Sequence, residues 1–428
     1  MGEIDILFIN PRTELGDKSK IFHREPPNGL LILGAVLENA GYEVNLLDLS
    51  VTPSELKTCL SEEPRIVGIT SLTNTYPLAM NILKEVKELS PNTITLYGGP
   101  HASFKFADIL SKNQFVDFIL CGEADQTILQ FMQAVTDQNY SKVPNLAYRE
   151  NGKIHYSECY IPTDLDALPL PARHLIDLEK YEVGTVIVNR GCVFNCAFCV
   201  RQRIFKKVRY RTIADIIYEM QTLSHLGYRF ANLYDNLNIS ENYAISLCHE
   251  IEKAKINLNW GCELRADRLS KELAESLKRA GCKVIAVGIE SADPEVLQRV
   301  NKEQDLKLVR KGVDNAKSMG LSVQAYFMTG LPGETEESFE LTRNFLENLH
   351  LDLGGDRVNF FAATPYPGTA LYEQPGQFGV HILHENWELY DNEHLIMELN
   401  SIKFEKLQKN FEKGKQIEKK FMSSINND

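Results

Sequence analysis

Short apolar runs alternate with amphipathic stretches through the first third of the chain. The apolar runs predict strands at residues 4–9, 44–47, 66–70, 94–97 and 115–120. Apolar positions that recur with the period of a helix predict helices at residues 29–40, 76–89 and 124–135. Because buried strands that alternate with helices are typical of parallel sheets, this part predicts an α/β domain with a doubly wound, Rossmann-like sheet.

A second series of strands and helices begins near residue 183. Its predicted strands are residues 185–188, 230–234, 258–264, 284–289, 323–328 and 358–361. Its predicted helices are residues 213–226, 241–254, 271–280, 306–319 and 338–349. Six such units favour a partial barrel of the TIM type, whose site lies at the carboxyl ends of the strands.

These patterns divide the chain into four parts. The doubly wound domain covers residues 1–140, and residues 141–182 form a proline-containing linker with few periodic runs. The partial (βα)6 barrel covers residues 183–375. Residues 376–428 form a charged C-terminal region that we expect to be mostly helical.

Ligands of a doubly wound sheet lie over the carboxyl ends of its strands. No G-x-G-x-x-G string follows the first strand, so a dinucleotide is a poor candidate. The adjacent Gly98 and Gly99 allow the backbone to approach a bulky flat ligand, or they serve only a tight turn. The candidate contacts are Asn10, Pro11, Thr70, Ser71, Leu72, Thr73, Gly98, Gly99, Pro100, His101, Gly122 and Glu123.

Charge and cysteine usage narrow the class of protein. The net charge is −12 over 428 residues, which disfavours broad binding to nucleic acid or to anionic membranes. The N-terminus lacks the features of a signal peptide, and we find no apolar run long enough to span a membrane. The nine cysteines are odd in number and do not suggest a disulfide framework, so we expect a soluble cytoplasmic protein.

Three cysteines on one loop carry the strongest chemical signal. Cys192, Cys196 and Cys199 have the spacing C-x3-C-x2-C, which suits three corners of an iron–sulfur cube and leaves the fourth iron open for chemistry. A zinc site would need a fourth ligand, and the candidates, brought near by folding, are Cys248, Cys262 and Cys282. Three merely buried cysteines are a further alternative. A catalytic thiol is less favoured, because no histidine partner is evident.

A basic segment follows the third cysteine. Residues 201–211 contain six Lys or Arg residues. They form either a solvated charged loop or a docking site for an anionic substrate or an electron donor.

The cysteine loop, placed after the first barrel strand, resembles that of the radical S-adenosylmethionine (SAM) superfamily. Similar pieces follow in order: Asn232-Leu-Tyr-Asp235, Trp260-Gly-Cys-Glu-Leu-Arg265, Val287-Gly-Ile-Glu-Ser291, Gly330-Leu-Pro-Gly-Glu-Thr335 and Thr364-Pro-Tyr-Pro-Gly-Thr369. Family members often carry a double acid where this chain has Asp235 followed by Asn236. Glu263 and Glu290 are also compatible with strand-end salt bridges. The resemblance implies a [4Fe-4S] cluster on the three cysteines and SAM contacts from Phe198, Tyr234, Asp235, Glu263, Arg265, Glu290 and Ser291.

The first domain resembles the cobalamin-binding domain of one large subgroup. The similar pieces are Pro27-Asn-Gly-Leu30, Val67-Gly-Ile-Thr-Ser71, Gly98-Gly-Pro-His-Ala-Ser103 and Gly122-Glu123. The string D-x-H-x-x-G, which supplies an axial histidine in other cobalamin proteins, is missing. The resemblance therefore implies a detached dimethylbenzimidazole and a lower cobalt face without a histidine ligand. His101 is the nearest histidine that could serve as that ligand, or it bonds only the backbone or the corrin edge.

The resemblance implies a cobalamin-dependent radical SAM methyltransferase that acts on an unactivated carbon or a phosphinate phosphorus. An oxidative cyclase or ring-remodelling enzyme without methyl transfer is one alternative, and a non-enzymatic corrinoid and iron–sulfur sensor or carrier is another. The expected partners are a small-molecule or peptide substrate and an electron donor of the reductase or flavodoxin type. No side chain is assigned a catalytic role.

Overall fold

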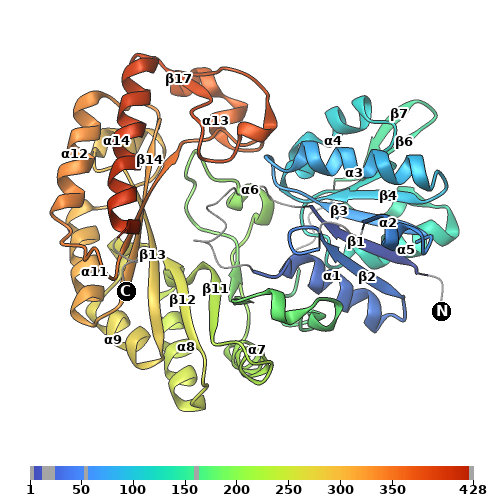
Figure 1. Cartoon of the computed structure of the whole chain (residues 1–428), viewed down its shortest axis with the longest axis horizontal. Coiled ribbons are helices and arrows are strands. Elements are labelled where there is room, and N and C mark those ends of the chain that lie inside the picture. Colours follow the sequence, from blue (N-terminus) through green and yellow to red (C-terminus); the bar gives the residue numbers. More distant parts are fainter. Residues whose placement is uncertain (1–3, 12–24, 53–55, 159–162, 424–428) are drawn as a thin grey trace. The chain divides into compact units, whose positions relative to one another are not determined.

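The structure is a computed structural model that describes residues 4–11, 25–52, 56–158 and 163–423. The chain divides into two compact units, Met1–Glu182 and Val183–Asp428 (Figure 1). Each unit is built on its own sheet, so each is described separately.

The sheet of the first unit runs in the order β2-β1-β3-β4-β5-β6-β7 over the described residues. Strands β1 to β5 are parallel, as predicted, whereas β6 and β7 are antiparallel. The strands are β1 Ile6–Asn10, β2 Val44–Asp48, β3 Ile66–Thr70, β4 Ile94–Gly98, β5 Phe118–Leu120, β6 Leu146–Glu150 and β7 Lys153–Tyr156. The helices are α1 Asn28–Asn39, α2 Leu56–Leu60, α3 Tyr76–Leu89, α4 Pro100–Lys112 and α5 Thr127–Asp137.

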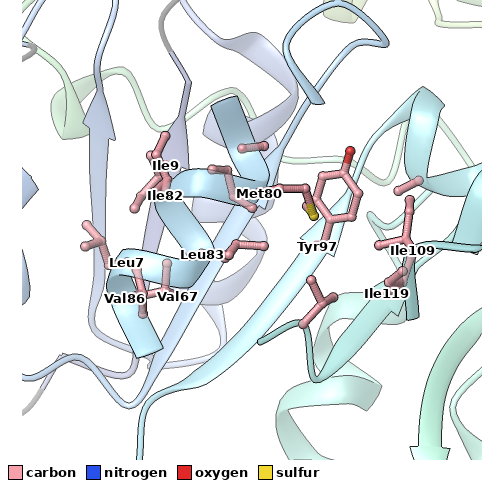
Figure 2. Packing of buried hydrophobic residues seen from close by; sticks show 14 of the residues in the cluster. Leu7, Ile9, Val67, Met80, Ile82, Leu83, Val86, Tyr97, Ile109 and Ile119 are labelled. Carbon is pink, nitrogen blue, oxygen red and sulfur yellow. The ribbon is translucent and has the colours of Figure 1, made fainter. Parts of the chain in front are cut away.

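Both faces of this sheet are buried, because successive side chains of a strand point to opposite sides. In β1, Leu7 and Ile9 join the core under α3 and α4, and Ile6 and Phe8 join the core under α1 and α5. Figure 2 shows the first of these cores, in which Ile82, Leu83 and Val86 of α3 cover the side chains of β1 and β3. The continuous apolar runs of the sequence are thus explained by a sheet with helices on both sides.

Two features of this unit were not predicted. Residues 141–182, predicted as a linker with few periodic runs, include β6 and β7, which extend the sheet, and further on Ala172 N donates a 3.0 Å hydrogen bond to Leu31 O of α1. The prediction also lacked α4, which begins at Pro100, one of the candidate contacts that follow the strand predicted at residues 94–97. Proline is favoured in the first turn of a helix, because its missing N–H would have no partner there.

The second unit contains a parallel sheet in the order β15-β14-β13-β12-β11-β8 within its described residues, which confirms the predicted partial barrel. Its strands are β8 Gly184–Ile187, β11 Phe230–Asn236, β12 Asn259–Leu264, β13 Cys282–Glu290, β14 Ser322–Thr329 and β15 Arg357–Ala362. Its helices are α6 Arg201–Phe205, α7 Ile213–His225, α8 Glu241–Ala254, α9 Lys271–Arg279, α10 Pro294–Arg299, α11 Leu306–Ser318, α12 Glu336–Glu347 and α13 Ala370–Glu373. Side-chain caps such as Ser270 and Asp305 begin these helices after the strand-end loops.

Among its described residues, the C-terminal region has short 3-10 turns in its first half and an α-helix only in its second half. Residues 380–399 contribute the antiparallel pair β16 Val380–Ile382 and β17 Met397–Leu399, and α14 Phe404–Ser423 follows. The backbone of α14 comes so close to β15 that a Cβ on Gly414 would lie 2.7 Å from the Phe360 ring. Figure 1 shows α14 in red beside β14 and α12. This region therefore completes the barrel unit rather than forming a separate tail.

None of the helices in the described part of the chain has the length and apolar character needed to cross a lipid bilayer.

Gly312 tests the packing of α11 on the barrel. A Cβ on this residue would overlap the carbonyl oxygen of Ala266, which is backbone and cannot turn away. We expect Gly312→Ala to lower the free energy of unfolding by about 1–3 kcal/mol in urea denaturation. The matched control is Gly29→Ala in α1, where no described atom lies within 4 Å of the new Cβ; it should be neutral or slightly stabilising. Equal stabilities for the two variants would contradict the packing argument.

Candidate functional site

The cysteine loop is closed at its base by a short antiparallel ladder. Strand β9 Asn189–Arg190 follows β8 and pairs with β10 Arg209–Tyr210. Between them, Gly191 has φ +94°, and a Cβ there would overlap the carbonyl oxygen of Lys207. Only glycine fits such a close approach in this conformation, so the residue before Cys192 fixes where the loop begins.

The middle of the loop is held by main-chain hydrogen bonds from two distant segments. Ala197 N donates to Val300 O at 2.8 Å, and Leu371 N donates to Ala197 O at 3.1 Å. Ala197 is buried in an apolar cluster that also contains Val300 and Leu371. Because these bonds use the backbone between Cys196 and Cys199, they set the positions of both cysteines.

The thiols of this loop are free and partly buried. Burial raises the pKa of Cys196 to about 11 and also raises the pKa of Cys199. Solvent alone would therefore leave both thiols protonated, and a bound metal group would have to stabilise the thiolates.

The donor set suits an iron–sulfur cluster better than zinc. Zinc gathers its ligands about 2.3 Å from one centre, and no three His, Cys, Asp or Glu side chains among the described residues are grouped to hold a metal ion. Cys248, Cys262 and Cys282 neighbour one another in the barrel core, where a hydrogen bond with Cys282 and burial raise the pKa of Cys262. A cubane takes one thiolate at each of its separate corners, which three cysteines spaced along one loop provide.

Lys302 is the residue of this site that the sequence analysis missed. Its Nζ lies 2.6 Å from Glu290 Oε1, 2.9 Å from Gly288 O and 6.0 Å from the centre of the Phe198 ring. This ammonium lowers the pKa of Cys196 and Cys199, so it opposes the effect of burial. Glu290 has φ +65°, and a Cβ on Gly288 would lie 2.5 Å from its Oε1. The Gly-x-Glu part of the predicted motif therefore makes room for an ion pair beside the cysteines.

Other predicted SAM contacts have partners within the protein. The Arg265 guanidinium pairs with Asp267 at 2.7 Å and lies 4.1 Å over the Phe194 ring of the cysteine loop. Glu263 lies 3.5 Å from Arg201 and is half exposed. Ser291 Oγ accepts a 3.1 Å hydrogen bond from Asp293 N. Arg265 and Ser291 thus support the loops around the site.

Tyr234 and Asp235 lie at the end of β11, where the sequence placed them. Tyr234 is half-buried, and the Asp235 side chain falls outside the part of the structure that is described.

Buried polar atoms without partners collect at the carboxyl ends of the barrel strands. A folded protein leaves few such atoms, and each needs an explanation. A polar ligand such as SAM would supply the missing hydrogen bonds, so this edge fits it. Within the described residues these atoms are Asn189 Oδ1, Asn236 Oδ1, Gln304 Oε1 and Thr329 Oγ1.

The recurring Gly330–Thr335 piece joins the barrel to its C-terminal helix. Glu334 is buried and accepts hydrogen bonds from Gly330 N at 2.6 Å and Asn410 Nδ2 of α14 at 3.3 Å. Desolvation raises the pKa of this carboxyl group from 4.5 to about 7. The motif therefore has a structural role that the sequence alone did not reveal.

The candidate cobalamin contacts from β3 and β4 come together at the carboxyl edge of the first sheet. His101 is buried, stacks on Tyr76 with ring centres 4.4 Å apart, and has Nδ1 3.3 Å from Thr73 Oγ1. Burial lowers the pKa of His101 to about 3, so the imidazole is neutral. Ser71 Oγ lies 2.5 Å from Tyr97 Oη. These polar groups form a satisfied network beneath the edge, whereas Leu72 above it is 56% exposed.

The remaining candidates shape the same edge. Gly99 has φ +101° and a Cβ there would lie 2.6 Å from Ser71 O, so Pro100 and His101 can follow only a glycine. Gly122 N donates a 2.8 Å hydrogen bond to Ser103 Oγ, and the next residue, Glu123, is half-buried. Thr70 is the last residue of β3, and Gly98 is its register partner in β4.

The edge also offers an unsatisfied group to a ligand. Asn10 at the end of β1 donates a 3.0 Å hydrogen bond to Asp48, and Pro11 after it is buried. Asn28 Oδ1 at the start of α1 is buried without a hydrogen-bond partner among the described residues. It belongs to the Pro27–Leu30 piece of the predicted cobalamin domain. A polar group of a bound corrin would satisfy it, so this edge fits cobalamin.

Two family models match the chain in the regions that carry these sites. The radical SAM superfamily matches residues 186–346, and the B12 binding domain matches residues 18–131. The first range contains the cysteine loop and most of the barrel, and the second contains β2 to β5 with their carboxyl ends.

Curated relatives extend over both units. An uncharacterized methyltransferase of Pyrococcus horikoshii is 29% identical over 96% of this chain and 91% of its own length. An anaerobic magnesium-protoporphyrin IX monomethyl ester cyclase of Rubrivivax gelatinosus is 26% identical over 87% of this chain and 70% of its own length.

Among solved structures, the methyltransferase TsrM of Kitasatospora setae, with cobalamin and a [4Fe-4S] cluster bound, matches with a TM-score of 0.74. The match covers 89% of this chain and 77% of that chain at 19% identity, and it shows a shared fold.

The Lys302–Glu290 pair should be worth more to stability than a surface pair. Lys302→Met leaves the buried Glu290 carboxylate without its cation, and we expect a loss of about 3–5 kcal/mol in urea denaturation. Adding Glu290→Gln to Lys302→Met should restore most of the lost stability. The control is Lys84→Met, whose pair with Glu88 has both side chains more than 60% exposed and should contribute under about 1 kcal/mol. Similar losses for Lys302→Met and Lys84→Met would overturn this assignment.

Glu334 should make stability fall as pH rises. Between 4.5 and about 7 the folded state keeps a proton that the unfolded state releases, so the free energy of unfolding decreases across this window and then stays constant. Glu334→Gln has no such proton, and its stability relative to wild type should increase by about 2–3 kcal/mol from about pH 4.5 to about pH 8. Thermal unfolding at several pH values measures the difference. A difference that does not change with pH would contradict the raised pKa.

Proposed function

This chain belongs to the cobalamin-dependent radical SAM enzymes, and we propose that it transfers a methyl group to an unactivated carbon, or to a phosphinate phosphorus, of its substrate. The chain is an enzyme whose cofactors are a [4Fe-4S] cluster, SAM and cobalamin. This membership sets aside the non-enzymatic sensor or carrier that the sequence left open.

The observation that carries the proposal is the fixed C-x3-C-x2-C loop at the barrel edge, on the same chain as a B12 binding domain. When bound, the cluster and SAM supply a carbon-centred radical and cobalamin supplies a methyl group. Cys192, Cys196 and Cys199 would hold the cluster. The unsatisfied atoms of Asn236, Gln304 and Thr329 would hold polar groups of SAM.

The chain's own contribution is to hold and orient rather than to transfer protons. Short-lived radicals require reacting atoms that are already positioned, and fixed main-chain bonds to Ala197 provide that at the cluster. No general base would be needed, because the substrate would lose a hydrogen atom rather than a proton. One SAM would become S-adenosylhomocysteine, and a second would become methionine and 5′-deoxyadenosine, with electrons from an external donor.

Similarity over nearly the whole chain favours methyl transfer. The P. horikoshii methyltransferase aligns with 96% of this chain, including the C-terminal region beyond the family model. The R. gelatinosus cyclase also aligns with most of the chain, so radical chemistry without methyl transfer is the second candidate. The two differ in the product, because methylation adds one CH2 unit to the substrate.

We also propose a small-molecule or peptide substrate, a reductase or flavodoxin-type electron donor, and a cytoplasmic location. A reducing compartment would keep the exposed cluster and the thiols of the loop intact.

The test uses anaerobically purified protein, a low-potential reductant and SAM labelled in its methyl group. We expect 5′-deoxyadenosine to form and label to appear in the corrin fraction. Replacing Cys192, Cys196 and Cys199 together by alanine should remove the iron and abolish 5′-deoxyadenosine. The control is Cys59→Ala in α2, outside the loop, which should retain iron and turnover.

The readouts separate the candidates. Formation of 5′-deoxyadenosine without label in the corrin fraction would favour the cyclase-like chemistry. Iron content unchanged by the triple replacement would refute the cysteine assignment.

A further inference from the structure

An exposed positive charge lies on the cysteine loop of the second unit. The guanidinium of Arg268 lies 4.7 Å from the centre of the Phe194 ring, which belongs to the middle of that loop. Arg268 is exposed and ends the short 3-10 turn Ala266–Arg268 that follows β12. Arg265 lies over the same ring, but it is buried and pairs with Asp267. Arg268 is therefore the one of these two arginines that a partner in solution can reach.

Helix α11 brings two further cations to this turn. The two segments pack so closely that a Cβ on Gly312 would overlap the Ala266 carbonyl oxygen. Leu308, one helical turn before Gly312, lies on the same face of α11 and is 46% exposed. Lys307 and Lys311 are exposed on either side of it in the sequence. We call the following residues the cationic surface: Arg268, Lys307, Leu308 and Lys311.

The three charges of the cationic surface are not neutralised by ion pairs. In the described part of the chain, no carboxylate forms an ion pair with Arg268, Lys307 or Lys311. The nearby Asp305 carboxylate caps α11, where it accepts hydrogen bonds from Lys307 N at 2.8 Å and Leu308 N at 3.4 Å. The ammonium groups of both lysines thus remain available to a partner.

The basic segment at residues 201–211 is more strongly engaged within the protein. Arg201 lies 3.5 Å from Glu263, and Arg211 pairs with the buried Glu219. The whole chain carries a net charge of −12, which repels an acidic partner unless positive charge is concentrated locally. The cationic surface provides such a concentration beside the cysteine loop.

We propose that the cationic surface docks an acidic electron-transfer flavoprotein, whose flavin gives one electron to the cluster. This inference rests on the proposed function in that the chain uses an external electron donor. The flavin is oxidised by one electron and the cluster is reduced by one, and no bond forms or breaks. Positive charge would steer the partner, and the exposed side chains of Leu308 and Val193, 46% and 52% exposed, would add apolar contact.

The position of the cationic surface favours an electron donor over an anionic substrate. A substrate of a barrel enzyme must reach the carboxyl ends of the strands. Lys307 and Lys311 instead lie on the exposed side of a helix that packs outside the sheet. An electron does not require direct contact between the donor and the cluster, so a partner docked on this surface can still serve the site.

The probe is flavodoxin, an acidic flavoprotein, and the test variant is Lys307→Glu combined with Lys311→Glu. Arg268 is left unchanged, because its replacement would also disturb Phe194. We expect calorimetry to show that the variant binds oxidised flavodoxin about tenfold more weakly than the wild type. Electron paramagnetic resonance should show slower cluster reduction by reduced flavodoxin, also by about tenfold. Reduction by dithionite, which needs no docking, should keep its rate.

The matched control is Lys255→Glu combined with Lys283→Glu, which changes the net charge equally. Both lysines are exposed and lie near the amino ends of the barrel strands, since Lys255 precedes β12 and Lys283 is the second residue of β13. The control should bind flavodoxin and accept electrons as the wild type does. Raising the salt concentration from about 0.05 to about 0.5 M should slow reduction of the wild type by flavodoxin more than that of the test variant.

The measurements separate docking from the chemistry of the cluster. Unchanged binding and reduction by flavodoxin in the test variant would overturn the inference, and so would equal losses in the test and control variants. A test variant that loses dithionite reduction to the same extent, or a wild-type cluster that dithionite reduces and flavodoxin does not, would also overturn it. Absence of 5′-deoxyadenosine from wild-type protein with dithionite and SAM would instead refute the proposed function, because binding and cluster reduction are measured without SAM.

Discussion

The main-chain bonds of Ala197 are the constraint on which the second unit's chemistry depends. Hydrogen bonds to Val300 and from Leu371 tie the cysteine loop to α10 and α13. These two helices lie far from the loop and from each other in the sequence of the second unit, and all three segments share one apolar cluster. Iron–sulfur cluster ligands that lie on a loop usually share the mobility of that loop. Here the loop shares the rigidity of the unit, since removing α13 would remove Leu371 and expose Ala197.

The fixed backbone of the cysteine loop determines which charges surround Cys196 and Cys199. Burial disfavours the thiolates of Cys196 and Cys199, and nearby cations oppose it: the guanidinium of Arg201 at Cys199 and the ammonium of Lys302 at both cysteines. That ammonium is shared with Glu290, whose positive φ and glycine neighbour place its carboxylate beside it. The pair contributes no net charge, so the cysteines depend on the irons for most of their stabilisation. A site of this kind is expected to change its electrostatics strongly when the cluster is assembled.

The sequence predicted strands better than the segments between them. The barrel strands were found because their apolar runs are long and bounded by polar strand ends, and the cysteine spacing was readable because its members are adjacent in sequence. Lys302 was not found, since its partners Glu290 and Phe198 meet it only in three dimensions. α4 was missed because Gly98–Gly99–Pro100 has the composition of a turn, although Pro100 in fact begins a helix. The β6–β7 hairpin was missed because its strands are short and β7 is largely exposed, which weakens the alternation.

Both candidate sites lie at the carboxyl ends of parallel strands, but the two edges differ in their buried hydrogen-bonding groups. At the barrel edge, Asn236, Gln304 and Thr329 have buried oxygens that find no partner in the described part of the chain, which suits a small ligand rich in hydrogen-bonding groups. At the first edge, Ser71, Thr73 and His101 already have partners, Asn28 Oδ1 is the buried oxygen that lacks one among the described residues, and Leu72 is exposed. A large flat ligand with an apolar face loses little by resting on such a surface. Parallel sheets thus determine where ligands bind, and the side chains at each edge determine which ligand fits.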